Sequence, residues 1–175
     1  FSAGVLQSLP AIVGVSCPSV ASYLRLRPHR WAGPWAAWGR ENREAGLRFV
    51  TGMIGSRPEA ANLEIKPVDG SSNPYLVLGA VVAAGLHGLE RDLRLPEPTT
   101  EDPASIPAAK RKKLGITQLP SSLDAAIGEL ERSSVLREAM GDMLFDSFLA
   151  TRRGEAEAFA GMDDDAVERA HRWRY

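Results

Sequence analysis

The stretch from Ala60 to Pro74 constrains the fold of this chain most, because it predicts a strand, a turn and a helix start in close succession. Apolar and polar residues alternate from Ala60 to Lys66, and successive side chains of a strand face opposite sides. Pro67 ends this strand, since proline has no N–H to give to a ladder. Asn73 then predicts a helix N-cap, with Pro74 at the first helical position.

The alternation gives the predicted strand one polar face and one apolar face. Asn62, Glu64 and Lys66 share the polar face, and Leu63 and Ile65 point the other way. Two interpretations remain open at this point. The polar face either meets water on a half-buried strand, or lines a ligand site.

The helix that follows is predicted from Asn73 to Glu90, and its nearly continuous apolar surface predicts burial inside a domain. The apolar run is shorter than the about 20 residues that cross a bilayer, so no membrane span is expected. Further helices are predicted at 2–15, from Ser121, at 134–140 and from Asp142; strands are predicted at 35–40 and 47–51, a loop at 53–59, and a long surface connection at 96–120.

The charge balance and the single cysteine argue against several classes of function. A formal net charge of −1 gives no reason to expect nucleic acid or an anionic membrane as a partner. Cys17 cannot form an internal disulfide, which favours a reducing compartment. We predict that Cys17 is a buried structural thiol, because no histidine lies near it in the sequence. The basic run from Lys110 to Lys113 is interpreted as a solvated loop tip.

Arginines are concentrated in one segment. Six arginines and no lysine lie between Arg25 and Arg48, where Glu41 and Glu44 are the only acids. The planar fork of arginine binds carboxylates and phosphates through paired hydrogen bonds. These arginines therefore predict a polyanion site, in which Glu64 could hold a divalent metal. The alternative is that they are solvated or paired with the local carboxylates.

Three motifs occur in an order that resembles the C-terminal half of the glutamine synthetase catalytic domain. They are S-Y-x-R-L at 22–26, W-G-x-x-N-R-x-x-x-x-R at 38–48 and L-E-I-K-P-x-D-x-S-S-N-P-Y at 63–75. The likeness extends to A-A-G-L-H-G-L at 83–89 and is strongest to the divergent FluG-like and γ-glutamyl–amine ligase branches. It implies an α+β fold, with antiparallel strands lining the site and helices packed outside.

The resemblance also implies a domain organisation and a reaction. Residues 1–175 would be the C-terminal part of the catalytic domain, without the β-grasp domain and the first part of the catalytic domain that precede it in the family. The full-length protein would be a cytoplasmic, ring-forming homo-oligomer. It would use ATP and Mg²⁺ or Mn²⁺ to phosphorylate the γ-carboxylate of glutamate, and an amine would then displace the phosphate. The chain alone is expected to be inactive, because most of the family's metal-ligand glutamates lie upstream.

Roles for individual residues follow from the resemblance alone. The implied substrate-binding residues are Arg25 and Lys66, the latter in place of an arginine. The implied phosphate-binding residues are Arg43, Arg48 and Asn62, with Arg43 also catalytic, and the implied metal ligand is Glu64.

Some positions depart from the family pattern. Leu24 replaces a lysine, Lys66 lacks the guanidinium fork, and Asn62 lacks a charge. The loop H-R-W-A-G-P at 29–34 has no counterpart of the flap glutamate of ammonia-using enzymes. These departures favour a γ-glutamyl–amine ligase over glutamine synthesis itself. The alternative is a degenerate, non-catalytic binding or scaffold module, against which stands the retention of Arg25, Arg43, Arg48 and Glu64.

Overall fold

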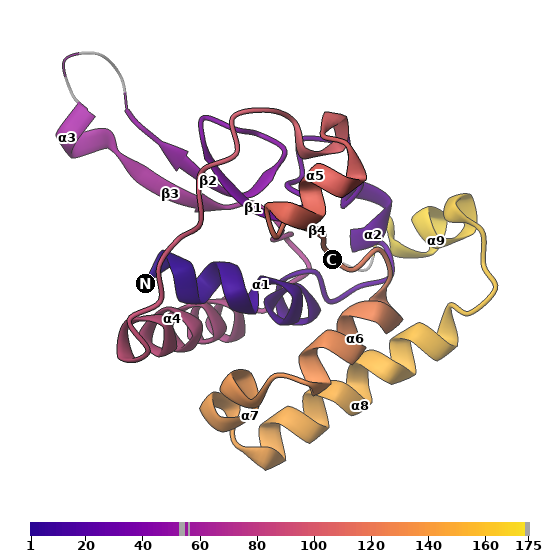
Figure 1. Ribbon diagram of the computed structural model, residues 1–175. Coiled ribbons are helices and arrows are strands. Elements are labelled where there is room, and N and C mark those ends of the chain that lie inside the picture. The colour runs from indigo at the N-terminus through magenta and orange to yellow at the C-terminus, as the bar shows by residue number, and fades with distance from the viewer. Residues whose placement is uncertain (53–54, 56, 174–175) are drawn as a thin grey trace.

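The computed structural model describes residues 1–52, 55 and 57–173, and it confirms an α+β fold of helices and one sheet (Figure 1). In chain order the elements are α1 (Ser2–Ser16), α2 (Ser22–Arg25), β1 (Trp35–Arg40), β2 (Ala45–Val50), α3 (Arg57–Ala60), β3 (Asn62–Ile65), α4 (Pro74–Glu90), η1 (Pro103–Ser105), α5 (Ala108–Lys113), β4 (Thr117–Gln118), α6 (Leu123–Glu131), α7 (Ser134–Met140), α8 (Asp142–Ala158) and α9 (Asp164–His171).

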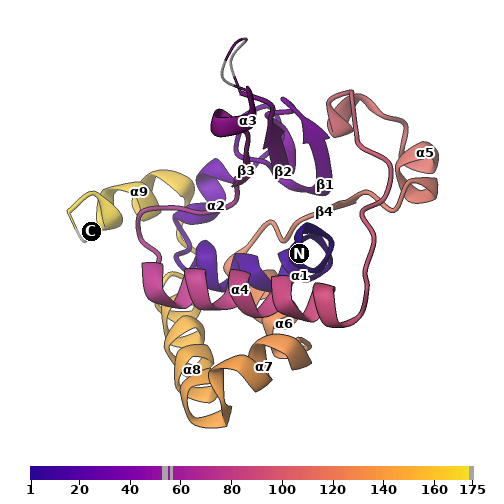
Figure 2. The same ribbon diagram turned by 90° about the vertical axis from the view of Figure 1, so that its left-hand side faces the viewer.

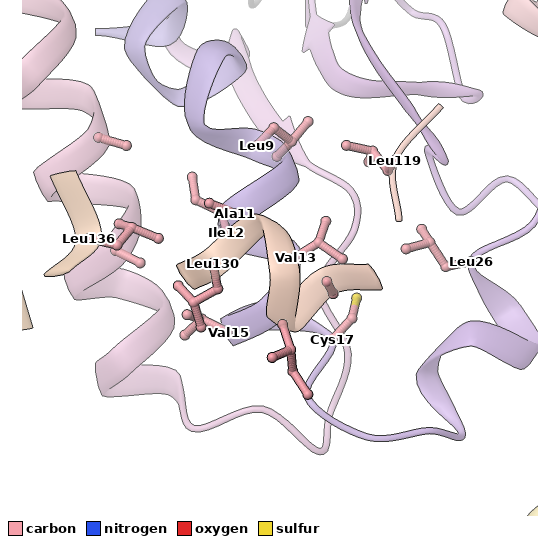
Figure 3. Packing of buried hydrophobic residues seen from close by; sticks show 14 of the residues in the cluster. Leu9, Ala11, Ile12, Val13, Val15, Cys17, Leu26, Leu119, Leu130 and Leu136 are labelled. Atoms are coloured by element: carbon pink, nitrogen blue, oxygen red, sulfur yellow. The ribbon is translucent and has the colours of Figure 1, made fainter. Parts of the chain in front are cut away.

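Helix α1 occupies the centre of the molecule. Figure 2 shows it between the sheet and α4, with α6, α7 and α8 on the side away from the sheet. Val5, Leu9, Ile12 and Val13 of α1 have no exposed surface. Figure 3 shows Leu9, Ile12 and Val13 among side chains from α6, α7 and the segments around them. Burial of each such side chain stabilises the fold by about 1.5–3 kcal/mol.

The sheet is mixed, with strand order β3-β2-β1-β4. The expected antiparallel pairing holds for β2 with β3 and for β1 with β4, whereas β1 and β2 are parallel. A short connection between strands usually forms an antiparallel hairpin. Here Asn42 of the connection donates hydrogen bonds to the carbonyls of Thr99 and Glu101. The connection is thus held by a segment remote in sequence, which the strand pattern does not reveal.

The start of α4 is confirmed as predicted. Asn73 caps the helix, and its Oδ1 accepts hydrogen bonds from the N–H groups of Tyr75 at 3.0 Å and Leu76 at 3.3 Å. The prediction of burial all round is wrong for one face, whose large apolar side chains are 41–85% exposed: Tyr75, Leu78, Val82, Leu86 and Leu89. An apolar surface shows only that a helix can be buried, and does not show which elements will cover it. Here α1 and α7 contact α4 without covering this face.

Several boundaries differ from the sequence predictions. Strand β3 begins at Asn62 rather than Ala60, because helix α3 precedes it within part of the predicted 53–59 loop. Residues 53, 54 and 56 of that loop lie outside the described residues. Strand β2 begins at Ala45, two residues before the predicted start at 47. The N-cap of α6 is Ser122 rather than Ser121, since the Ser122 Oγ accepts from the N–H of Ala125.

The 96–120 connection contains η1, α5 and β4, so the interpretation of Lys110 to Lys113 as a loop tip is wrong. These residues belong to helix α5. Arg111 donates to the carbonyls of Pro103 and Ile106, and its guanidinium lies over the ring of Trp35. The basic run is therefore helical, and Arg111 has a structural role. Among the described residues, no helix is long and apolar enough to cross a membrane.

Helices α1 and α4 approach each other closely at Gly4 and Gly88. A Cβ on Gly88 would lie 2.6 Å from the Cα of Gly4, which is too close for the two backbones to keep their positions. We expect Gly88→Ala to lower the free energy of unfolding by about 2–3 kcal/mol. The matched control is Gly79→Ala on the same helix, where a Cβ meets nothing within 4 Å. It should raise that free energy by about 0.5–1 kcal/mol. Urea unfolding of both variants tests this, and equal effects would contradict it.

The thiol of Cys17 has no exposed surface, and burial raises its pKa to about 12. This agrees with the prediction of a structural cysteine. Because only the thiolate is nucleophilic, we expect the folded protein to resist a thiol-labelling reagent at neutral pH. Unfolding in urea should make the thiol fully reactive. Rapid labelling of the folded protein would contradict this expectation.

Candidate active site

The antiparallel register of β2 and β3 places Arg48 directly opposite Glu64. Directly opposite residues project from the same face of a sheet. The Nη1 group of Arg48 donates to both carboxylate oxygens of Glu64, at 3.3 Å and 3.2 Å. The Nη2 group donates to Oε2 of Glu41 at 2.6 Å. Arg48 is therefore held between two carboxylates.

Sequence reasoning assigned no site role to Glu41, although its place among the arginines was a usable signal. Its φ of 53° lies in the left-handed region, which is uncommon for a residue with a side chain. Its Oε1 accepts hydrogen bonds from the N–H of Thr51 at 2.8 Å and from the Thr51 hydroxyl at 3.1 Å. The bond from the Thr51 N–H, followed by the bonds from Arg48 and from the Thr51 hydroxyl, holds the pKa of Glu41 below its usual range. The same Glu41 bond raises the pKa of Arg48.

Arg43 lies on the connection between β1 and β2. Its guanidinium carbon is 5.2 Å from the ring centroid of Trp31. Both side chains are exposed. The backbone of Trp31 donates a hydrogen bond to the buried carboxylate of Glu44. The loop at 29–34, which stands out in the sequence only because it lacks the flap glutamate, thus contains an aromatic contact of Arg43.

The remaining predicted residues lie on or beside β3. Asn62 is exposed at its start and donates to the carbonyl of Ala60. Lys66 directly follows β3 and is half-buried. Arg25, at the end of α2, donates to the carbonyl of Val68 at 2.9 Å. Arg48 and Glu64 are thus in contact, and Arg25 lies against the segment that follows Lys66.

Two of the predicted residues stay apart from that contact. Within the part of the chain that the structure describes, neither Arg43 nor Asn62 forms a hydrogen bond with Arg48 or Glu64. The described residues also contain no group of three or more His, Cys, Asp or Glu side chains that could hold a metal ion. Glu64 can therefore supply one carboxylate toward a metal, and the described residues do not complete a metal site.

The Glu41–Arg48 contact predicts a dependence of stability on pH. A carboxyl whose pKa is lowered in the folded protein stabilises the fold while ionised, and this contribution is lost as the pH falls through the lowered pKa. We expect Glu41→Gln to be less stable than the unmodified protein at neutral pH. The difference should shrink as the pH falls below the ordinary carboxyl value of 4.5. Urea unfolding over a pH series measures it, and a pH-independent difference would contradict the expectation.

Comparisons with known proteins give the family. The family model described as the glutamine synthetase catalytic domain matches residues 1–171. The γ-glutamylpolyamine synthetase GlnA3 of Streptomyces coelicolor is 51% identical over the whole chain, which spans 38% of that protein. Protein fluG of Emericella nidulans is 36% identical over 95% of the chain, which spans 19% of that protein.

A solved structure gives the same result. The crystal structure of a novel glutamine synthase homologue superposes with a TM-score of 0.81 at 37% identity, covering 99% of this chain and 38% of that one. The predicted resemblance, including its FluG-like and γ-glutamyl–amine branches, is confirmed by these relatives. The chain belongs to the glutamine synthetase family and forms part of its catalytic domain.

Proposed function

We propose that this chain is the C-terminal part of an ATP-dependent ligase, which joins the γ-carboxyl of glutamate to an amine through γ-glutamyl phosphate. The observation that carries the proposal is the Arg48–Glu64 pair, formed by two family motifs on facing strands. An arginine and a metal-binding carboxylate at one point are the groups that phosphoryl transfer requires.

Arg48 and Arg43 are proposed to bind the phosphates of ATP and the transferring phosphoryl group, with Arg43 as the catalytic residue and Asn62 at the edge of this region. The 18% exposed side chain of Arg48 is oriented by its two carboxylate partners, so its guanidinium is fixed in place before a phosphate arrives. Glu64 would supply one ligand to Mg²⁺ or Mn²⁺, and a bound ion would neutralise charge on the phosphates.

Arg25 and Lys66 are proposed to hold the charged groups of glutamate. Lys66 presents a point charge in place of a bidentate fork. As the amine acceptor we propose a polyamine rather than ammonium. The support is the 51% identity with a γ-glutamylpolyamine synthetase and the absence of a carboxylate from the loop at 29–34. A ring-forming homo-oligomer in the cytoplasm is proposed from the family alone.

A non-catalytic scaffold is the second candidate. Asn62 favours it, because this residue carries no charge and its amide is bonded to the nearby carbonyl of Ala60. The pairing of Arg48 with Glu41 and Glu64 is compatible with either function. The ligase is supported by the retention of four residues of the family pattern, Arg25, Arg43, Arg48 and Glu64.

Phosphate release by the full-length protein tests the ligase. We expect release from ATP to require Mg²⁺, glutamate and one amine among ammonium, a polyamine and an aromatic amine. Glu64→Ala should lower the rate by about a hundredfold or more, because a lost metal ligand removes several kcal/mol of charge stabilisation. The matched control is Glu138→Ala, an exposed acid of α7 at the far end from the sheet (Figure 1).

Two outcomes would contradict the proposal. Normal turnover of Glu64→Ala would remove Glu64 from the site. Absence of release with every amine, from a protein of native oligomeric size, would favour the scaffold. Equal loss in Glu64→Ala and Glu138→Ala would show that the assay reports folding rather than chemistry.

A further inference from the structure

The backbone of the loop at 29–34 is hydrogen-bonded to a buried carboxylate, that of Glu44. Glu44 is 7% exposed, and its side chain accepts hydrogen bonds from the N–H groups of His29 at 3.2 Å and Trp31 at 2.9 Å. The Glu44 N–H in turn donates to Oδ1 of Asn42 at 3.0 Å. Hydrogen bonds to an ionised acceptor are stronger than neutral ones. Glu44 therefore determines the backbone path of this loop.

That path places Trp31 in an unusual conformation. Its φ of 55° lies in the left-handed region, where a bulky residue is an outlier. Such conformations persist only where the surroundings impose them, and they cluster at functional sites. The indole is 65% exposed, so the strain does not serve the burial of a large apolar side chain. The loop instead directs the side chain of Trp31 toward the protein surface.

The exposed indole of Trp31 contacts the guanidinium of Arg43. The guanidinium carbon of Arg43 lies over the ring at 5.2 Å from its centroid, a geometry in which the cation is attracted to the ring face. No described residue accepts a hydrogen bond from the Arg43 guanidinium, so its N–H donors stay available to a ligand. Arg48 differs, because its terminal nitrogens are already bound to Glu41 and Glu64.

The loop also lies beside Lys66, one of the two proposed substrate residues. Gly33 is so near Lys66 that a Cβ on this glycine would be 2.8 Å from the Cβ of Lys66. The loop that contains Trp31 thus packs against the residue that directly follows β3. The Trp31–Arg43 pair lies on the two segments that flank β1, one before the strand and one after it.

We propose that Trp31 is a positioning residue, which holds Arg43 with its N–H donors open to a phosphate, and that Glu44 fixes the loop that presents it. This inference rests on the proposed function, in which Arg43 binds the transferring phosphoryl group. The ring of Trp31 would orient Arg43, as the carboxylates of Glu41 and Glu64 orient Arg48.

Kinetics of phosphate release by the full-length protein test the role of Trp31. The variants are Trp31→Leu, Trp31→Phe and Arg43→Ala, with Trp173→Leu as a control because Trp173 is 90% exposed. We expect Trp31→Leu to lower kcat/KM for ATP by about fivefold, the effect of one exposed cation–π contact. The KM for glutamate should stay unchanged. Trp31→Phe should restore most of the activity, since a phenyl face can still carry Arg43, and Trp173→Leu should behave as the unmodified protein.

A double variant separates positioning from packing. In the Arg43→Ala background, Trp31→Leu should have no further effect, because there is no guanidinium left to position. Additive losses would overturn the inference, as would normal kinetics of Trp31→Leu beside a clear loss in Arg43→Ala. Normal activity of Arg43→Ala would overturn it as well, while the ligase itself stands. Absence of phosphate release by the unmodified protein would instead overturn the proposed function.

Discussion

The burial of helix α1 is the constraint on which the rest of the structure depends. Its apolar side chains are enclosed by the sheet on one side and by α4 and α6 on the other. The contact with α4 is closest where Gly4 meets Gly88 backbone to backbone. On the sheet side, Leu9 lies against Gly46 of β2. The core thereby sets the position of the strand that carries the arginine of the site.

The site follows from this packing through the alternation of side chains. Leu47 is buried in the core and Ile65 packs against it at the facing position of β3. The next residues along the two strands, Arg48 and Glu64, must then point to the other face. Their contact is a consequence of strand register, so the hydrophobic residues determine where the charged ones meet.

Two carboxylates on the connection between β1 and β2, Glu41 and Glu44, organise both arginines. Glu41 binds Arg48 directly, whereas Glu44 holds the loop whose Trp31 carries Arg43. Arg48 is consequently neutralised by carboxylates, whereas Arg43 contacts an aromatic ring and forms no ion pair with any other described residue. In our proposal these two environments suit two tasks. One arginine stands beside Glu64, which we propose as a metal ligand, and we propose that the other binds a phosphate.

The sequence by itself determined the features that depend on neighbouring residues. The alternation around Glu64, the Asn73 cap of α4 and the ordered family motifs were all predicted, because strand pleat and helix capping are local. Tertiary structure alone decided the parallel pairing of β1 and β2, the exposed face of α4 and the partners of Arg48 and Arg43. Each of these depends on which distant segment lies alongside, and residue order within one segment does not contain that contact.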